Sequence, residues 1–242
     1  DHFDGRRFFN PDHPSTDKTA ADLMRWRRSK TERGAWPSQP PVAVRADVPP
    51  ARVAGGIRAT MVGHASVLIQ VAGLNILTDP VWSPRASPLA FAGPRRFTPP
   101  GIAFEALPPI DWVLISHNHY DHLDLPTLRR LARAHAPRVL TPLGNETVLR
   151  RAGRGLQVTT GDWGAGFDLG AGVEAVIHPA NHWSARGVRD RRFALWGGFL
   201  LRTPAGLIYF AGDTGYGTGA IFRAVRRDFG PPRLAFLPIG AY

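Results

Sequence analysis

Four side chains that can bind a metal ion stand within six residues near the middle of the sequence. The run from His117 to His122 contains three imidazoles and the carboxylate of Asp121. Neutral imidazole nitrogen and carboxylate oxygen are good ligands for Zn²⁺ and its neighbours. In an extended turn alternate residues point the same way, so His117 and His119 can bind one ion. Asp121 and His122, which follow the bend, can reach a second ion.

Two further candidate ligands follow short apolar runs. His182 comes after the run 173–178, and Asp213 comes after the run 207–210. The glycines beside Asp213 allow a sharp turn that exposes a carboxylate. His178 is an alternative to His182, with packing beside the site as its other role. Together with the His cluster, these residues indicate one metal centre that is ligated from three parts of the chain.

Composition narrows the chemistry of this centre. The 242 residues include no cysteine, so disulfides and thiolate metal sites are excluded.

A hydrophobic content of 43% excludes a disordered chain. No apolar run reaches the ~18 residues needed to span a bilayer, and no targeting leader is visible. We therefore expect a cytoplasmic protein, with membrane association, or a signal that was cleaved or is missing, as alternatives.

The elements that must position the ligands are mainly short strands. The apolar patterns of 57–62, 66–71 and 74–78, separated by turns, predict three strands. The continuous apolar run 112–115 is typical of a strand buried on both faces, and it leads directly into His117. Further strands are expected over 139–141, 173–178, 199–203, 207–210 and 234–237, and helices over 19–29 and from Pro126 onward.

Two segments differ from this pattern. Residues 1–56 are rich in proline and carry large aromatic residues such as Phe8 and Trp36, which predicts an N-terminal arm packed on a domain formed by residues 57–242. Residues 80–110 are also rich in proline and predict a long irregular loop. Ordered loops of this length are often functional.

The His cluster, followed by a later His and a strand-end Asp, resembles the metallo-β-lactamase superfamily. Within it, the sequence is similar to the N-acyl-phosphatidylethanolamine-hydrolysing phospholipase D family and its bacterial RomA-like relatives. The finer likeness spans nearly the whole chain. It is carried by His2-Phe3-Asp4-Gly5, Gly63-His64-Ala65-Ser66, Arg85-Ala86-Ser87-Pro88, Leu114–Asp124, Asn181-His182-Trp183 and Tyr209–Tyr216.

The resemblance implies an α/β fold, the four-layer αββα sandwich, with a dinuclear zinc site at one edge of its two sheets. It implies that the first zinc is held by His117, His119 and His182, the second by Asp121 and His122, and both by a bridging Asp213. The family carries one more His ligand of the second zinc downstream of the segment that matches Leu237–Tyr242. We therefore expect that ligand, and the C-terminal part of the domain, to be absent from this chain.

The implied activity is phospholipase D-type hydrolysis of N-acyl-phosphatidylethanolamine-like lipids. Two zinc ions would share a hydroxide that attacks phosphorus and would neutralise charge on the phosphate. Asp121 and Asp213 are the candidate catalytic carboxylates. Asp79 is expected to hydrogen-bond a ligand imidazole or to stabilise its own turn. The candidate substrate-binding residues are Arg186 for the phosphate, Tyr120, Trp183 and Tyr216 as pocket wall, and His64, which lines the site or braces its turn.

Two other functions compete with this one. A lactonase or phosphorylated-metabolite hydrolase would share the fold but have a small polar pocket, whereas an apolar groove formed by Val81, Trp82, Leu89 and Phe91 would favour a lipid. The net charge of +11 attracts an anionic partner: a phosphate-bearing substrate, an anionic membrane or nucleic acid. An Arg-rich nucleic-acid-binding protein or nuclease is the least favoured, because no nucleic-acid motif is present.

Overall fold

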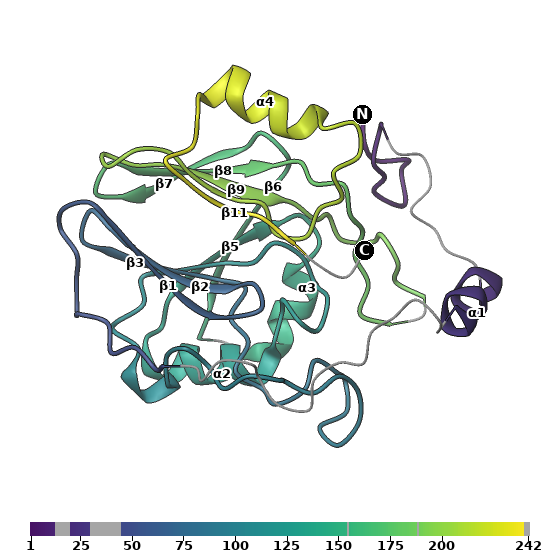
Figure 1. The fold of residues 1–242 in the computed structure, drawn as a ribbon, viewed down its shortest axis with the longest axis horizontal. Coiled ribbons are helices and arrows are strands. Elements are labelled where there is room, and N and C mark those ends of the chain that lie inside the picture. Colours follow the sequence, from purple (N-terminus) through teal and green to yellow (C-terminus); the bar gives the residue numbers. More distant parts are fainter. Residues whose placement is uncertain (13–19, 30–44, 154, 188, 240–242) are drawn as a thin grey trace.

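The computed structural model describes residues 1–12, 20–29, 45–153, 155–187 and 189–239, in two β-sheets that lie face to face (Figure 1). The first sheet has the order β1-β2-β3-β4-β5-β6 and the second β11-β10-β9-β8-β7. The strands of the first sheet are β1 (Ile57–Gly63), β2 (Ser66–Val71), β3 (Leu74–Thr78), β4 (Trp112–Leu114), β5 (Arg138–Pro142) and β6 (Gln157–Gly161). Those of the second are β7 (Gly166–Gly170), β8 (Val173–His178), β9 (Gly198–Arg202), β10 (Ile208–Phe210) and β11 (Leu234–Phe236).

Helices cover the outer faces of both sheets. Figure 1 shows α4 over the second sheet, with α2 and α3 on the far side of the first. None of the helices that the structure describes has the length and apolar character of a membrane span. The helices are α1 (Ala20–Arg28), α2 (Leu125–Ala134), α3 (Glu146–Leu149) and α4 (Ala220–Phe229), with short 3₁₀ turns η2 (Phe104–Ala106) and η3 (Arg150–Ala152).

Three apolar clusters hold these layers together. Leu114 of β4 and Phe199 of β9 belong to the cluster between the sheets, where both are fully buried. Leu128 of α2 joins the cluster on the outer face of the first sheet. Val225 of α4 packs with Tyr209 on the outer face of the second. The αββα sandwich implied by the resemblance is therefore confirmed.

Strand direction brings the candidate ligands to one edge. Strands β3, β4, β5 and β6 pair in parallel, so their carboxyl ends share an edge of the first sheet. In the second sheet β9 pairs antiparallel with both β8 and β10, so β8 and β10 run the same way. The segments that follow β3 and β4, and those that follow β8 and β10, therefore leave their sheets at common edges.

The first twelve residues contact the segment that carries His182. Phe8 is buried in a cluster with Trp196. Asn10 donates a 2.8 Å hydrogen bond from Nδ2 to the carbonyl of His182, and Trp196 donates from Nε1 to Oδ1 of Asn10 at 3.1 Å. The N-terminal segment thus fixes the main chain of a candidate ligand. Trp36, which was expected to help anchor the arm, lies outside the described residues.

Most predicted strands are found within one or two residues of their expected ends, but four elements were missed. Strands β6 and β7 are short and half-exposed, and β7 begins and ends with glycine, which is depleted in strands. The four-residue α3 is too short to give a periodic signal. Helix α4 does carry one, because Phe222, Val225 and Phe229 recur at helical spacing.

The turn after β10 has room only for glycine. Gly212 has φ +60°, and a Cβ there would lie 2.8 Å from Cβ of Ser116 and 3.1 Å from the carbonyl oxygen of Gly197. The strained φ and the overpacking together cost about 2–4 kcal/mol. We therefore expect Gly212→Ala to lower the free energy of unfolding by that amount in urea titrations.

Gly73→Ala is the matched control. Gly73, in the turn between β2 and β3, has φ +78° with open space around it, so the same change adds strain but no clash, and we expect a loss of about 1–2 kcal/mol. Equal losses in the two variants would contradict the close approach of the Gly212 turn to the loop that follows β4.

Candidate metal centre

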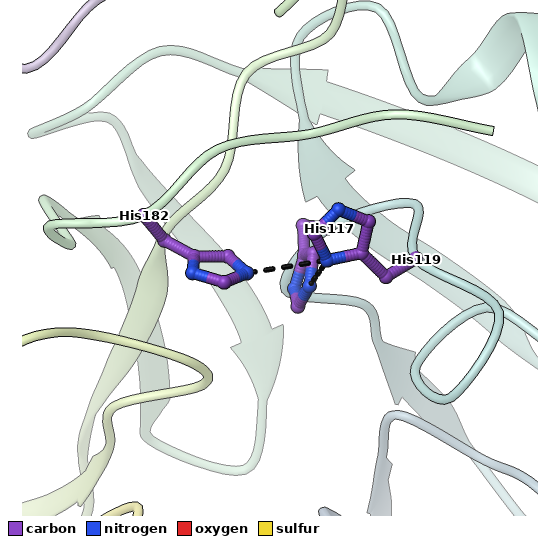
Figure 2. A group of neighbouring side chains, drawn as sticks. All are labelled: His117, His119 and His182. Carbon is purple, nitrogen blue, oxygen red and sulfur yellow. Dashed lines mark hydrogen bonds between the residues drawn. The ribbon is translucent and has the colours of Figure 1, made fainter. Parts of the chain in front are cut away.

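Three ring nitrogens converge where β4 and β8 end. Nε2 of His117 lies 2.8 Å from Nδ1 of His119, and Nε2 of His182 lies 3.2 Å from the same Nδ1. Figure 2 shows the rings of His117 and His182 directed at His119. His117, His119 and His182 thus form a group whose ring nitrogens could hold a metal ion. The loop after β4 supplies two of them and the loop after β8 the third.

The carboxylate of Asp213 lies between this group and His122. Its Oδ2 is 3.3 Å from Nε2 of His122 and 3.7 Å from Nε2 of His182. His117, His122 and Asp213 form a second group that could hold a metal. On the other side, Oδ2 of Asp121 is 3.8 Å from Nε2 of His122. The structure thus brings all six predicted ligands together, with Asp213 between His122 and His182.

His64 is closer to this centre than the sequence suggested. Its Nε2 lies 3.0 Å from Oδ2 of Asp121, and its ring meets that of His122 edge-on at 5.0 Å. These three residues form the third group that could hold a metal ion. Because β2 pairs antiparallel with β3, the turn from β1 to β2 lies at the edge where β3 ends. His64 is therefore a candidate ligand as well as a wall residue.

A buried carboxylate positions the ligand loop. Asp79 follows β3, and its two oxygens accept hydrogen bonds from the main-chain nitrogen and the hydroxyl of Ser116 at 2.7 and 2.6 Å. Nδ1 of His122 lies 2.7 Å from Oδ2 of Asp79 and donates to it. Because Asp79 holds the proton on Nδ1, Nε2, which faces Asp213, is the nitrogen that can bind a metal ion once its own proton is displaced. The predicted contact of Asp79 with a ligand imidazole is confirmed.

Burial keeps the three converging imidazoles neutral. Burial, helped by the neighbouring imidazoles, lowers the pKa of His117 well below its usual range. It lowers the pKa of His119 to about 4 and that of His182 to about 3, although nearby carboxylates oppose the shift. Neutral imidazole is the form that binds metal ions. At neutral pH these lone pairs are available without the loss of a proton.

His122 and Asp121 carry opposite charges. Burial disfavours the cation of His122, but the charges of Asp79 and Asp213 outweigh it and raise the pKa of His122 well above its usual value. Burial likewise opposes ionisation of Asp121, but hydrogen bonding to His64 and the charge of His122 lower its pKa. Nε2 of His122 is buried, lies 3.3 Å from Oδ2 of Asp213 and forms no well-directed hydrogen bond. A metal cation that displaced its proton would satisfy both this nitrogen and the carboxylate, so the residues fit a metal ion.

A cavity of about 730 Å³ opens beside the centre. The ligand residues His64, His119 and Asp121 form one wall, and Tyr120 and Trp183 line it as the sequence predicted. The loop 80–110 supplies much of the remaining wall. Its contributions are Val81, Ser83, Ala86, Pro94, Arg95, Arg96, Phe97 and Thr98. The two arginines were missed, since nothing in the sequence pattern separates them from the other arginines.

Two residues predicted to contact substrate are placed elsewhere. Tyr216 is 71% exposed and stacks on Phe222 of α4, so the prediction that it lines the pocket is wrong. Nη1 of Arg186 donates to the carbonyls of Leu123 and Asn118 at 2.7 and 3.1 Å. These contacts tie Arg186 to the ligand loop, and its role as a phosphate ligand stays a prediction.

The predicted apolar groove is only partly present. Val81 lines the cavity, whereas Trp82 packs edge-on against Phe104 in the core below the first sheet. Leu89 and Phe91 are 47% and 78% exposed and lie outside the cavity. Pro94 and Phe97 supply apolar wall in their place.

The alternative ligand His178 lies outside all three metal-binding groups. Its Nδ1 contacts the carbonyl of Pro179 at 3.0 Å, and its ring packs edge-on against Tyr209 at 5.5 Å. Burial lowers its pKa to about 4. His178 is therefore a core residue beside the site, and His182 is the residue that joins the cluster.

Comparisons with known proteins show the family to which this chain is similar. Residues 74–242 match the family described as Beta-lactamase superfamily domain. N-acyl-phosphatidylethanolamine-hydrolyzing phospholipase D 1 of Caenorhabditis elegans is 37% identical over 196 residues, which cover 77% of this chain and 54% of that protein. This chain thus spans about half the length of that relative. A UPF0173 metal-dependent hydrolase of Pyrobaculum neutrophilum is 32% identical over 183 residues, or 74% of this chain and 70% of the relative.

Solved structures of similar fold include metal enzymes. CmlA, a diiron β-hydroxylase from Streptomyces venezuelae, is 30% identical to this chain and superposes with a TM-score of 0.56. The match covers 75% of this chain and 34% of the CmlA chain. Igni18, a metallo hydrolase from Ignicoccus hospitalis, is 22% identical with a TM-score of 0.55 over 77% of this chain and 72% of its own. The second likeness shows the fold alone.

Nε2 of His117 and Nε2 of His182 both face Nδ1 of His119, so loss of the His119 imidazole should abolish metal binding by these three residues. We expect His119→Ala to lose at least one metal equivalent per chain, measured by inductively coupled plasma mass spectrometry after dialysis. His135→Ala is the matched control, since His135 ends α2 and belongs to none of the three groups. Equal metal content in the two variants would contradict the assignment.

The two kinds of imidazole predict different pH dependences of metal binding. His119 and His182, with pKa values lowered to about 4 and 3, are neutral from pH 6 to 8. The affinity of their group should therefore change little over that range. The raised pKa of His122 means that a metal must displace its proton, so affinity there should rise as pH increases, by up to about tenfold per pH unit.

Titration calorimetry at pH 6, 7 and 8 in buffers of different ionisation enthalpy measures both effects. Metal binding by His117, His119 and His182 should release few protons, and metal binding at His122 should release about one. Two events with the same pH dependence would show that the charges around His122 do not hold its proton.

Proposed function

Because this chain belongs to the metallo-β-lactamase superfamily and, within it, resembles the N-acyl-phosphatidylethanolamine-hydrolysing phospholipases D, we propose that it is a zinc phosphodiesterase that cleaves phospholipids of that type. The supporting observation is the cavity beside the metal centre, which combines two arginines with apolar and aromatic walls. The arginines can pair with the negative charge of a phosphodiester, and the apolar walls can contact acyl chains. Its 730 Å³ lies within the range of small-molecule sites.

We assign the metal ligands from the three groups. His117, His119 and His182 would hold one ion, Asp121 and His122 a second, and Asp213 both, with His64 beside the second ion. Imidazole and carboxylate ligands without thiolate suit zinc. When bound, zinc supplies Lewis acidity, which lowers the pKa of water and neutralises charge on phosphate.

The chain's own residues then orient the reactants. Asp121 lines the cavity and is held at 3.0 Å by His64, so its carboxylate can accept a hydrogen bond from the attacking water and aim it at phosphorus. Arg95, and the donors of Arg96 that its hydrogen bond to the carbonyl of Val81 leaves free, can pair with the phosphate oxygens. Trp183 shields the site from solvent. Water adds to phosphorus, the P–O bond to the ethanolamine oxygen breaks, and that oxygen takes a proton.

The cavity favours a lipid over the two alternative substrates. A phosphorylated metabolite or a lactone needs a small polar pocket, and a nucleic acid needs an open cationic groove. Val81, Pro94 and Phe97 instead give this cavity an apolar wall. Leu89 and Phe91, exposed at the tip of the same loop, could contact the lipid surface from which a substrate is drawn.

The direct test incubates zinc-loaded protein with N-acyl-phosphatidylethanolamine in detergent micelles. Mass spectrometry should detect phosphatidic acid and N-acylethanolamine in equal amounts, and a chelator should stop their release. Turnover of a lactone or a sugar phosphate without any turnover of the lipid would overturn the proposed substrate.

Arg95 should bind the substrate phosphate. A hydrogen bond to a charged group contributes about 1.5–3 kcal/mol, so Arg95→Gln should lower kcat/KM about 10- to 100-fold. Arg226→Gln, the same change on the exposed face of α4, should leave kcat/KM within twofold. A similar loss in both variants would indicate a general charge effect rather than a contact at the site.

A further inference from the structure

A second cavity, of about 310 Å³, lies next to the metal cavity. Ser83 and Tyr120 line both cavities, so they form the partition between them. The second cavity is bounded by the loop 83–90, by the start of α2 and by the 3₁₀ turn η3. Four arginines line it, namely Arg85, Arg129, Arg151 and Arg186. We call it the arginine cavity.

Main-chain carbonyls hold three of the four guanidinium groups in place. Arg85 donates to the carbonyl of Gly93 at 2.6 Å, and Arg129 donates to that of Arg151 at 2.8 Å. Arg186 is held by two carbonyls, and its guanidinium lies 3.7 Å above the ring of Tyr120. Carbonyls orient a guanidinium without neutralising its charge, and each guanidinium has five donors. Donors therefore remain for a ligand, and the side chains are already ordered.

The arginine cavity has one acidic side chain, and its hydrogen bonds are directed elsewhere. Oδ2 of Asp124 accepts from the hydroxyl of Thr127 at 2.6 Å and from the main-chain nitrogen of Ser83 at 3.0 Å, and Oδ1 accepts from the Ser83 hydroxyl at 2.9 Å. Among the residues that the structure describes, no carboxylate forms an ion pair with the four arginines. Four arginine charges against the one carboxylate of Asp124 leave the cavity cationic, and a bound anion relieves the remaining repulsion.

We propose that the arginine cavity is a binding site for a phosphate group, separate from the metal centre. Guanidinium forks match phosphate oxygens in bidentate geometry, which favours phosphate over a carboxylate or chloride. The volume admits a phosphate and a small substituent. Tyr120 and Ser83 separate the arginine cavity from the metal cavity. The proposed phosphate site therefore stands whichever substrate binds at the metal centre.

Two sources could supply this phosphate, a phospholipid headgroup or a free phosphate. The loop that lines the cavity through Ser87, Pro88 and Ala90 also exposes Leu89 and Phe91. Apolar side chains beside a cationic cavity suit the headgroup region of a bilayer.

The test uses the metal-loaded protein and compares two double variants of equal charge. Arg129→Gln/Arg151→Gln removes two guanidinium groups from the cavity, and both residues are exposed. Arg223→Gln/Arg226→Gln removes the same charge from exposed positions on α4. Metal content is measured first, so that loss of a metal-bound phosphate is not mistaken for loss of this site.

Titration calorimetry with inorganic phosphate should show, besides any binding at the metal centre, a saturable site that weakens at least tenfold in the cavity variant and less than twofold in the α4 variant. Cosedimentation with phosphatidic acid vesicles, against phosphatidylcholine vesicles, identifies the source. Greater loss of vesicle binding in the cavity variant than in the α4 variant assigns the site to headgroups, whereas loss of phosphate binding alone assigns it to free phosphate. Equal behaviour of the two variants in both assays would overturn the proposal.

Discussion

The site depends on one buried carboxylate, Asp79, at the end of β3. It holds the ligand loop through Ser116 and accepts a hydrogen bond from Nδ1 of His122, while the hydroxyl of Ser66 donates to its main-chain carbonyl at 2.5 Å. A buried carboxylate is costly unless it is hydrogen-bonded and paired. Here each hydrogen bond that offsets this cost also positions part of the metal centre. Stability and ligand geometry therefore rest on the same contacts.

Strand direction explains why residues distant in sequence meet at this point. Parallel pairing of β3 with β4, and the shared direction of β8 and β10, place their carboxyl ends at one edge of the sandwich. The apolar cluster between the sheets, which includes Leu114 and Phe199, then sets the spacing across which His117 and Asp213 face each other. Asn10 adds a contact from the N-terminus, because its side chain holds the carbonyl of His182.

Burial and charge divide the site into regions with different chemistry. The imidazoles of His117 and His182 are neutral because burial disfavours their cations, whereas His122 is held as a cation by two carboxylates. In the arginine cavity, Arg129 and Arg151 are exposed to solvent, whereas burial lowers the pKa of Arg186. Tyr120 stands between the metal cavity and the arginine cavity, with the guanidinium of Arg186 on its ring. The metal centre and the arginine cavity thus remain separate, although Arg95 and Arg96 line the metal cavity itself.

The sequence by itself determined the ligand loop and most strands, because spacing within a few residues and apolar runs of strand length are local features. Proximity in sequence misled at Tyr216, which follows Asp213 but turns outward to stack on Phe222. Only the tertiary structure distinguished Arg95, which lines the metal cavity, from Arg186, which is tied to main-chain carbonyls. The reason is that an arginine's role depends on which groups from other strands and loops surround it, and chain folding alone brings those groups together.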